Sequence, residues 1–154
     1  MRISQAAFDL IVSEEVSSQA YYAKNYTHFE WPGGASGPTV GIGYDVGYVT
    51  REEIKRDWSG ILDAQSIAML QTAAGKRGGD GQAFVAYNGR SVTVPWSAAI
   101  KEFQDREIPK WQARVDKVLP NTDLLAGDSY GALVSIAYNR GTGGFMSDGD
   151  RYRE

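Results

Sequence analysis

The stretch Thr39-Val40-Gly41-Ile42-Gly43-Tyr44-Asp45 decides how the rest of this chain is interpreted. Its apolar residues alternate with glycine, a pattern typical of a short β-strand. Thr39 and Asp45 are six residues apart, and in one regular strand this even separation places both side chains on the same face. The glycines leave the intervening backbone open to close approach of a ligand. The stretch therefore predicts a small β-region that presents a hydroxyl and a carboxylate together.

A helix is expected before this stretch. Ser4 is suited to its N-cap, and apolar residues follow at helical spacing: Phe8, Ile11 and Val12. The spacing predicts a helix over about residues 5–14. Glu14 and Glu15 lie at its end, where negative charge opposes the helix dipole. Residues 16–49 are rich in Gly, Tyr and turn residues, which predicts a sheet of two or three short strands.

Helical patterns fill most of the remaining chain. Thr50 and Glu53 have the capping-box spacing, and Asp63 is suited to cap the next helix. Residues 76–95 predict a glycine-rich connection, with a strand near residues 91–94. Three more helices are expected: about 96–107, Pro109 to about 119, and from an Asp128 N-cap to Gly141. The order helix, small sheet, then several helices predicts an α+β protein dominated by helix.

Composition excludes several classes of protein. The chain has 154 residues, which favours one domain, and a net charge of -3, which does not favour nucleic-acid binding. It contains no cysteine, so disulfides and thiolate chemistry are excluded. His28 is the only histidine, and no metal-binding motif surrounds it. The N-terminal segment is too polar for a signal peptide or a membrane span, so we expect synthesis in the cytoplasm.

The carboxylates near the small β-region match the needs of glycosidic bond cleavage. One carboxyl group must protonate the leaving oxygen. A second carboxylate must activate the water or stabilise the developing cation. Their surroundings set which group keeps its proton. Glu14 or Glu15, with Asp45 and Thr39, supplies these groups. The alternative interpretation is a solvated helix end followed by a strand whose glycines ease a bend.

Three segments together resemble the phage-type lysozymes, the endolysin muramidases, and in particular the branch similar to the pesticin catalytic domain. They are residues 10–15 with Tyr22 following, residues 39–44, and residues 132–141 with Phe145. The resemblance implies one lysozyme-like domain over residues 1–154, with an N-terminal lobe and β-hairpin over about 1–50 and a helical lobe over about 51–154. Family members usually continue through further helices, so that lobe is expected to be short or truncated.

The resemblance also assigns roles to residues of this chain. Glu15 takes the place of the general acid, because Tyr22 then falls at the family's distance beyond it, and Glu14 is the fallback. Thr39 matches the active-site threonine. The resemblance places further residues along the substrate site: Tyr22, Tyr44, Ser135, Asn139 and Arg140.

The second carboxylate departs from the commonest family pattern. Many members have an aspartate nine residues after the acid, where this chain has Lys24, which cannot act as a base while charged. The pesticin-like branch instead has its aspartate just after the Gly-x-Gly strand, and Asp45 matches that position. Glu30 is a distant alternative.

The implied activity is hydrolysis between N-acetylmuramic acid and N-acetylglucosamine in bacterial peptidoglycan, which lyses the host cell. The protein is then expected to act as a monomer without metal or cofactor, and to reach the periplasmic wall through a holin-dependent membrane lesion. Two alternatives stay open: a lytic transglycosylase acting on the same polymer, and an inactive module that only binds peptidoglycan.

Overall fold

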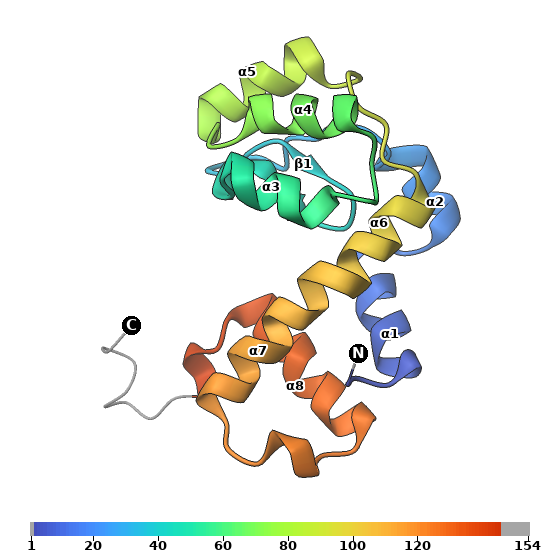
Figure 1. The fold of residues 1–154 in the computed structure, drawn as a ribbon, viewed down its shortest axis with the longest axis vertical. Coiled ribbons are helices and arrows are strands. Elements are labelled where there is room, and N and C mark those ends of the chain that lie inside the picture. The colour runs from blue at the N-terminus through green and yellow to red at the C-terminus, as the bar shows by residue number, and fades with distance from the viewer. Residues whose placement is uncertain (1, 146–154) are drawn as a thin grey trace. The chain divides into compact units, whose positions relative to one another are not determined.

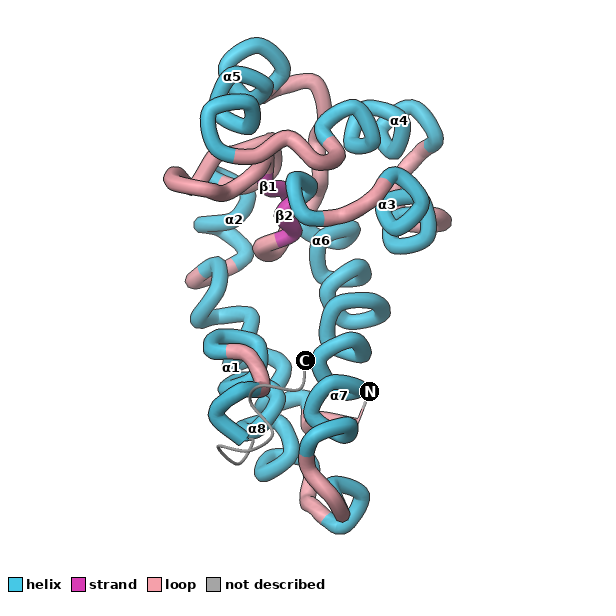
Figure 2. Tube along the Cα trace, turned by 90° about the vertical axis from the view of Figure 1, so that its left-hand side faces the viewer, coloured by secondary structure: helices cyan, strands magenta, loops and turns pink. Residues whose placement is uncertain are grey.

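The computed structural model describes residues 2–145, which are mostly helical and contain one small antiparallel sheet (Figures 1 and 2). This confirms the expected α+β class dominated by helix. The chain forms two compact units: a central unit, Glu15–Phe103, and a discontinuous unit, Met1–Glu14 with Gln104–Glu154. These boundaries differ from the division near residue 50 expected from the sequence. No described helix is long and apolar enough to cross a membrane.

The central unit surrounds its short strands with helices, and Figure 1 shows β1 close to α3 and α4. It begins with the last residues of helix α1 (Gln5–Val16). Its other elements are α2 Gln19–Asn25, β1 Thr39–Val40, β2 Tyr44–Asp45, the 3₁₀ turn η1 Val46–Tyr48, α3 Arg51–Trp58, α4 Ala64–Ala73, α5 Gly78–Asn88 and α6 Trp96–Glu102.

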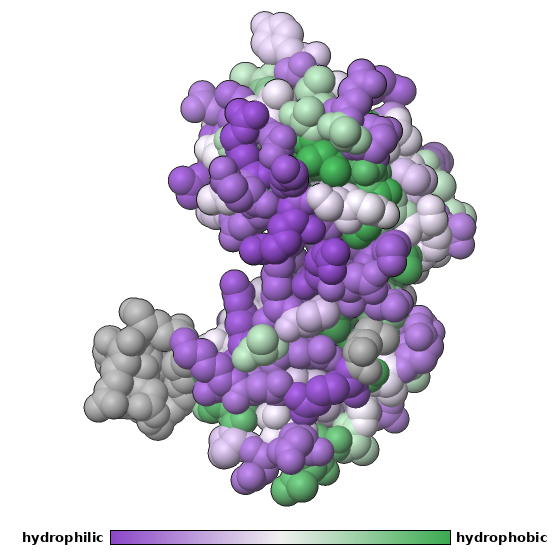
Figure 3. All heavy atoms as spheres, in the orientation of Figure 1, coloured by the Kyte–Doolittle hydropathy of each residue, from purple (hydrophilic) through white to green (hydrophobic). Residues whose placement is uncertain are grey.

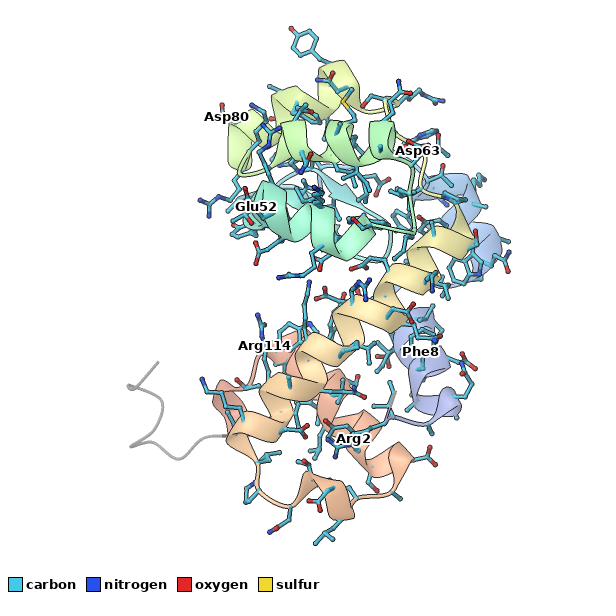
Figure 4. All side chains as sticks on the ribbon, in the orientation of Figure 1. Arg2, Phe8, Glu52, Asp63, Asp80 and Arg114 are labelled. Carbon is cyan, nitrogen blue, oxygen red and sulfur yellow. The ribbon has the colours of Figure 1, made fainter. Side chains whose placement is uncertain are left out.

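Two helix starts form as their local sequence predicts. Thr50 and Glu53 make the capping box: the Thr50 hydroxyl accepts the Glu53 N–H at 3.2 Å, and the Glu53 carboxylate accepts the Thr50 N–H at 2.7 Å. Asp63, labelled in Figure 4, caps α4 by accepting the Ser66 N–H at 2.7 Å. Each interaction joins residues three apart, so the sequence contains all that is needed to predict it.

The stretch 39–45 is a hairpin rather than one strand. Strands β1 and β2 are antiparallel, with Thr39 paired to Asp45. The chain reverses at Gly41 and Gly43, whose φ angles of +60° and +68° lie in the left-handed region that glycine adopts without strain. Thr39 and Asp45 are therefore cross-strand partners, which again places both side chains on one face.

Helix α5 corrects the expected glycine-rich connection. Its early glycines disfavour helix locally, but tertiary packing holds the segment. A side chain at Gly81 would come within 3.0 Å of the Ser36 carbonyl oxygen, so the close approach needs glycine. Phe84 packs edge-on against Phe29 at 5.3 Å between ring centroids. Residues 91–94 form no strand, and α2 is a further helix that the sequence analysis did not predict.

The core of the central unit gathers around Trp58, which is fully buried and packs edge-on against Tyr44 at 5.3 Å between ring centroids. Other buried side chains include Tyr22, Val46, Ile54 and Leu70. Hydrophilic side chains predominate on the face drawn in Figure 3, and apolar residues there form smaller patches. The core around Trp58 holds the short strands mainly by packing, because two strands of two residues provide few hydrogen bonds.

The discontinuous unit is built from helices. Its elements are the first ten residues of α1, the π-helix η2 Phe103–Glu107, α7 Ile108–Val118, the 3₁₀ turn η3 Thr122–Leu124, α8 Gly127–Arg140 and the 3₁₀ turn η4 Gly143–Phe145. Helix α1 runs two residues beyond its expected end. Pro109 lies in the first turn of α7, directly after the π-helix η2, so the chain is helical without a break from Trp96 to Val118. Helix α8 ends as expected at Gly141, whose φ is +72°.

The start of α8 differs from the prediction. Ala126 occupies the N-cap without a side-chain hydrogen bond, and Asp128 instead accepts a hydrogen bond from the Ser4 hydroxyl. Ser4 also accepts the Ala7 N–H at 3.0 Å, so it caps α1 as predicted. A side chain at Gly131 would come within 2.3 Å of the Ala7 Cβ. This close contact fixes how α1 and α8 pack together. Asp128 accepts its hydrogen bond from Ser4 across the same interface.

Candidate active site

The central unit contains a cavity of about 440 Å³ that holds two carboxyl groups and a threonine hydroxyl. Its polar side chains are Glu15, Tyr26, His28, Glu30 and Thr39, and it also borders the hairpin turn at Gly41 and Gly43. We call it the active-site cavity. All of these residues belong to the central unit, so the cavity is complete within one compact body.

Glu15, and not Glu14, lies at this cavity. Both residues are in the last turn of α1, but successive helical side chains point about 100° apart. Val16 is buried and anchors the helix end, Glu15 is partly exposed at the cavity, and Glu14 is exposed. The structure therefore brings the residue expected to be the general acid, rather than the fallback, together with Thr39.

Thr39 forms the centre of a row of three residues on neighbouring extended segments. It pairs with Asp45 in the hairpin and forms an isolated antiparallel bridge with Glu30. Side chains directly opposite each other in antiparallel pairs share a face of the sheet. The Thr39 hydroxyl donates to the Gly37 carbonyl oxygen at 3.2 Å. The row Glu30–Thr39–Asp45 therefore places one hydroxyl between two carboxyl groups.

The carboxylate of Asp45 is held by the backbone. It accepts the Gly37 N–H at 3.1 Å with either oxygen and the Gly47 N–H at 2.9 Å, which caps the 3₁₀ turn η1. Asp45 is not among the residues that line the active-site cavity. The second carboxylate expected from the sequence is thus rigidly oriented beside Thr39, with its oxygens turned to the loop of Gly37 and Gly47.

Glu30 is the second carboxyl group that lines the cavity itself. Partial burial raises the pKa of its carboxyl group above the usual value. A carboxyl group in such surroundings retains its proton more readily, which is the property of an acid in glycosidic cleavage. The sequence offered Glu30 only as a distant alternative. Its pairing with Thr39 spans a loop whose closure the local pattern does not predict.

Tyr26 and His28 complete the polar lining and were not predicted as site residues. Desolvation, followed by the nearby Tyr21 and Glu30, raises the pKa of Tyr26. The His28 ring Nδ1 donates to the Val92 carbonyl oxygen at 2.9 Å. Tyr26, His28 and Glu30 alternate in sequence, but residues 26–28 form a turn and bends rather than a strand, so the tertiary structure brings them to the cavity.

Tyr22 and Tyr44, expected along the substrate site, lie in the core. Tyr22 is fully buried, and its hydroxyl donates to the Val94 carbonyl oxygen at 2.8 Å. Burial raises the pKa of this hydroxyl. Tyr44 is 5% exposed, and its hydroxyl donates to Asp57 Oδ2 at 2.8 Å. Neither ring offers an exposed face to a ligand, so both act in packing.

Ser135, Asn139 and Arg140 lie on α8 and belong to the discontinuous unit. The Asn139 side-chain amide donates to the Ser135 carbonyl oxygen at 2.9 Å, within the helix. The active-site cavity is therefore built without these three residues, and their expected contact with substrate stays a prediction.

The cavity offers two carboxyl groups and a hydroxyl within one concave surface, which are groups that acid-catalysed cleavage of a glycosidic bond uses. Among residues 2–145, no group of three or more His, Asp or Glu side chains is arranged to hold a metal ion. Comparison with protein-family models, with curated proteins and with solved structures found no match for this chain.

Proposed function

We propose that this protein is a phage-type lysozyme that hydrolyses the bond between N-acetylmuramic acid and N-acetylglucosamine in peptidoglycan. One observation carries the proposal: Glu15, at the end of a helix, shares a cavity with Thr39 and a second carboxyl group, Glu30. The resemblance in sequence to the phage-type lysozymes, which includes Glu15 and Thr39, also supports it. Lysis of the host from the periplasm, after holin-dependent release, belongs to the same proposal.

In the proposed mechanism, Glu15 donates its proton to the glycosidic oxygen as the C–O bond breaks. Thr39 and Asp45 position and activate a water molecule on the opposite face of the sugar ring. Attack by water on the face opposite the leaving group inverts the configuration at the anomeric carbon. This geometry requires carboxyl groups roughly 6.5–9.5 Å apart, so that water fits between them. A separation near 5 Å would instead favour a retaining double displacement.

Mass analysis of fragments released from purified peptidoglycan tests the proposal. Wild type should release products with a reducing muramyl end. Glu15→Gln should lower the rate about 10²–10⁴-fold, because it removes one acid–base group. Glu14→Gln is the matched control, since it makes the same change one residue away and outside the cavity. Near-normal activity of Glu15→Gln would contradict the assignment.

A lytic transglycosylase is the second candidate, and one observation favours it. The Asp45 carboxylate already serves as a backbone cap for Gly37 and Gly47, a use that requires no catalytic role. In this reaction one carboxyl group suffices: the leaving oxygen takes the proton from Glu15, the muramyl C6 hydroxyl attacks the anomeric carbon, and the Glu15 carboxylate accepts the proton that this hydroxyl loses. Anhydro-muramyl products, together with an active Asp45→Asn variant, would identify this reaction.

A further inference from the structure

A second cavity, of about 550 Å³, lies in the central unit beside the active-site cavity. It is bordered by the end of α2, the segment 27–30 and the end of α5 with the loop after it. His28 and Glu30 line both cavities. The two cavities are therefore neighbours.

Two cations line the second cavity without an internal counter-ion. Neither the Lys24 nor the Arg90 side chain forms an ion pair or hydrogen bond with another residue in the part of the chain that the structure describes. The Arg2 guanidinium, by contrast, is paired with Asp116 at 2.7 Å. Two positive charges without an ion pair thus line one hollow of a protein with a net charge of -3, and the surrounding walls focus their field on an anion.

Glu30 is the only acidic residue that lines this second cavity among the described residues. Because burial raises the pKa of its carboxyl group, Glu30 opposes an incoming anion less than an ordinary carboxylate does. Tyr87, which also lines the cavity, is 90% exposed and leaves its ring available for contact with a ligand.

The wall of the cavity is held in place by hydrogen bonds of its own. The Phe29 N–H donates to the Gly89 carbonyl oxygen at 3.0 Å, and the Val94 N–H donates to the Thr27 carbonyl oxygen at 2.8 Å. His28 is anchored to the Val92 carbonyl oxygen at 2.9 Å. These bonds preform the hollow, so a ligand need not order the backbone when it binds.

We propose that this second cavity binds carboxylate groups of the peptide stems attached to the glycan, with Lys24 and Arg90 as the anion-binding side chains. The inference rests on the proposed function, because it takes peptidoglycan as the polymer. An Arg guanidinium matches a carboxylate with paired N–H donors, and a Lys ammonium adds a mobile positive charge. A peptide-bearing glycan supplies sugars to the active-site cavity and acidic groups to the cavity next to it.

Binding of soluble fragments tests this inference directly. The probe is a disaccharide–peptide with free carboxylates, compared with the same fragment carrying amidated carboxylates, in an NMR titration. Wild type should bind the amidated fragment roughly tenfold more weakly, because two charge-assisted contacts are lost. Lys24→Gln combined with Arg90→Gln should weaken binding of the acidic fragment to a similar extent and abolish the preference.

The control variant combines Arg51→Gln with Lys55→Gln. It removes the same two charges from exposed positions on α3 in the same unit, away from both cavities. It should bind both fragments as wild type does. Equal binding of acidic and amidated fragments by wild type, or unchanged binding by the Lys24 and Arg90 variant, would overturn the inference.

Fragment release from peptidoglycan separates this inference from the proposed function. Charge-dependent binding without release of glycan products would refute the lysozyme proposal and leave the carboxylate site standing. Release of products without charge-dependent binding would refute the carboxylate site and leave the lysozyme proposal standing. Circular dichroism of each variant establishes that the fold is intact, as expected for changes at exposed side chains.

Discussion

Glu30 and Thr39 exchange both of their backbone hydrogen bonds, with N···O distances of 2.9 and 2.7 Å. Thr39 is also the cross-strand partner of Asp45. The threonine hydroxyl therefore lies between carboxyl groups from two neighbouring segments. Substitution of each carboxyl group in turn tests which of them activates water in the proposed reaction.

Asp45→Asn should lower the rate of peptidoglycan cleavage about 10²–10⁴-fold, because the amide cannot accept a proton from water. The fold should persist, since the asparagine oxygen can still accept the N–H groups of Gly37 and Gly47. Glu30→Gln is the matched comparison and should reduce the rate less. Initial rates with purified cell walls measure both, and the opposite order of effects would assign the second carboxylate to Glu30.

Gly37→Ala should destabilise the protein and reduce activity. The added Cβ would come within 2.5 Å of both Asp45 Oδ1 and the Gly47 Cα, so the loop that orients Asp45 must shift. Overpacking of this kind costs about 1–3 kcal/mol. Gly79→Ala is the control, because it lies in α5 with open space around it and should stabilise by up to about 1 kcal/mol. Urea denaturation of both variants measures the free energy of unfolding, and equal values would contradict the prediction.

Tyr44→Phe should lower stability by about 1–3 kcal/mol, because a buried hydroxyl no longer donates to Asp57. KM should not change, since the ring is enclosed by the core. Tyr48→Phe removes the exposed hydrogen bond to the Ala35 carbonyl oxygen and should alter stability by less than about 0.5 kcal/mol. A raised KM with unchanged stability for Tyr44→Phe would instead restore the substrate contact expected from the sequence.

Asp116 should make the stability of the discontinuous unit depend on pH. Its carboxylate accepts hydrogen bonds from Thr122 at 2.6 Å, from Tyr130 at 2.8 Å and from Arg2, labelled in Figure 4, at 2.7 Å. Burial alone would raise the pKa of Asp116, but these donors together lower it. Burial and the Asp116 carboxylate raise the pKa of Tyr130 to about 12, so its hydroxyl remains a donor throughout the acid range.

When folding lowers the pKa of a carboxyl group, its interactions stabilise the protein at pH values above the pKa in the unfolded chain, which is about 4 for an aspartate. This stabilisation is lost as the pH falls through the pKa in the folded protein. The Tm of Asp116→Asn should therefore be lower than that of wild type at pH 7. On acidification below about pH 4, the Tm of the variant should fall by less than that of wild type. Asp123→Asn, an exposed change in the same unit, is the control. Identical acid sensitivity of wild type and Asp116→Asn would refute this role.

Local sequence patterns predicted several features correctly. The caps at Ser4, Thr50 and Asp63 and the helix end at Gly141 each depend on residues within one turn, and all four are confirmed. The Asp128 cap was wrong because Ser4, which is distant in sequence, takes its carboxylate. Local rules fail at the point where a distant residue offers a better partner.

The sequence by itself determined the α+β class, several helix ends and a set of candidate polar residues, because these depend on neighbouring residues and on composition. Only the tertiary structure decided which of them meet. Burial of Tyr22 and Tyr44 removed them from the ligand surface, and pairing across a loop brought Glu30 to Thr39. Such pairings depend on packing between segments far apart in the chain, as Phe84 packs on Phe29, and no local period encodes that contact.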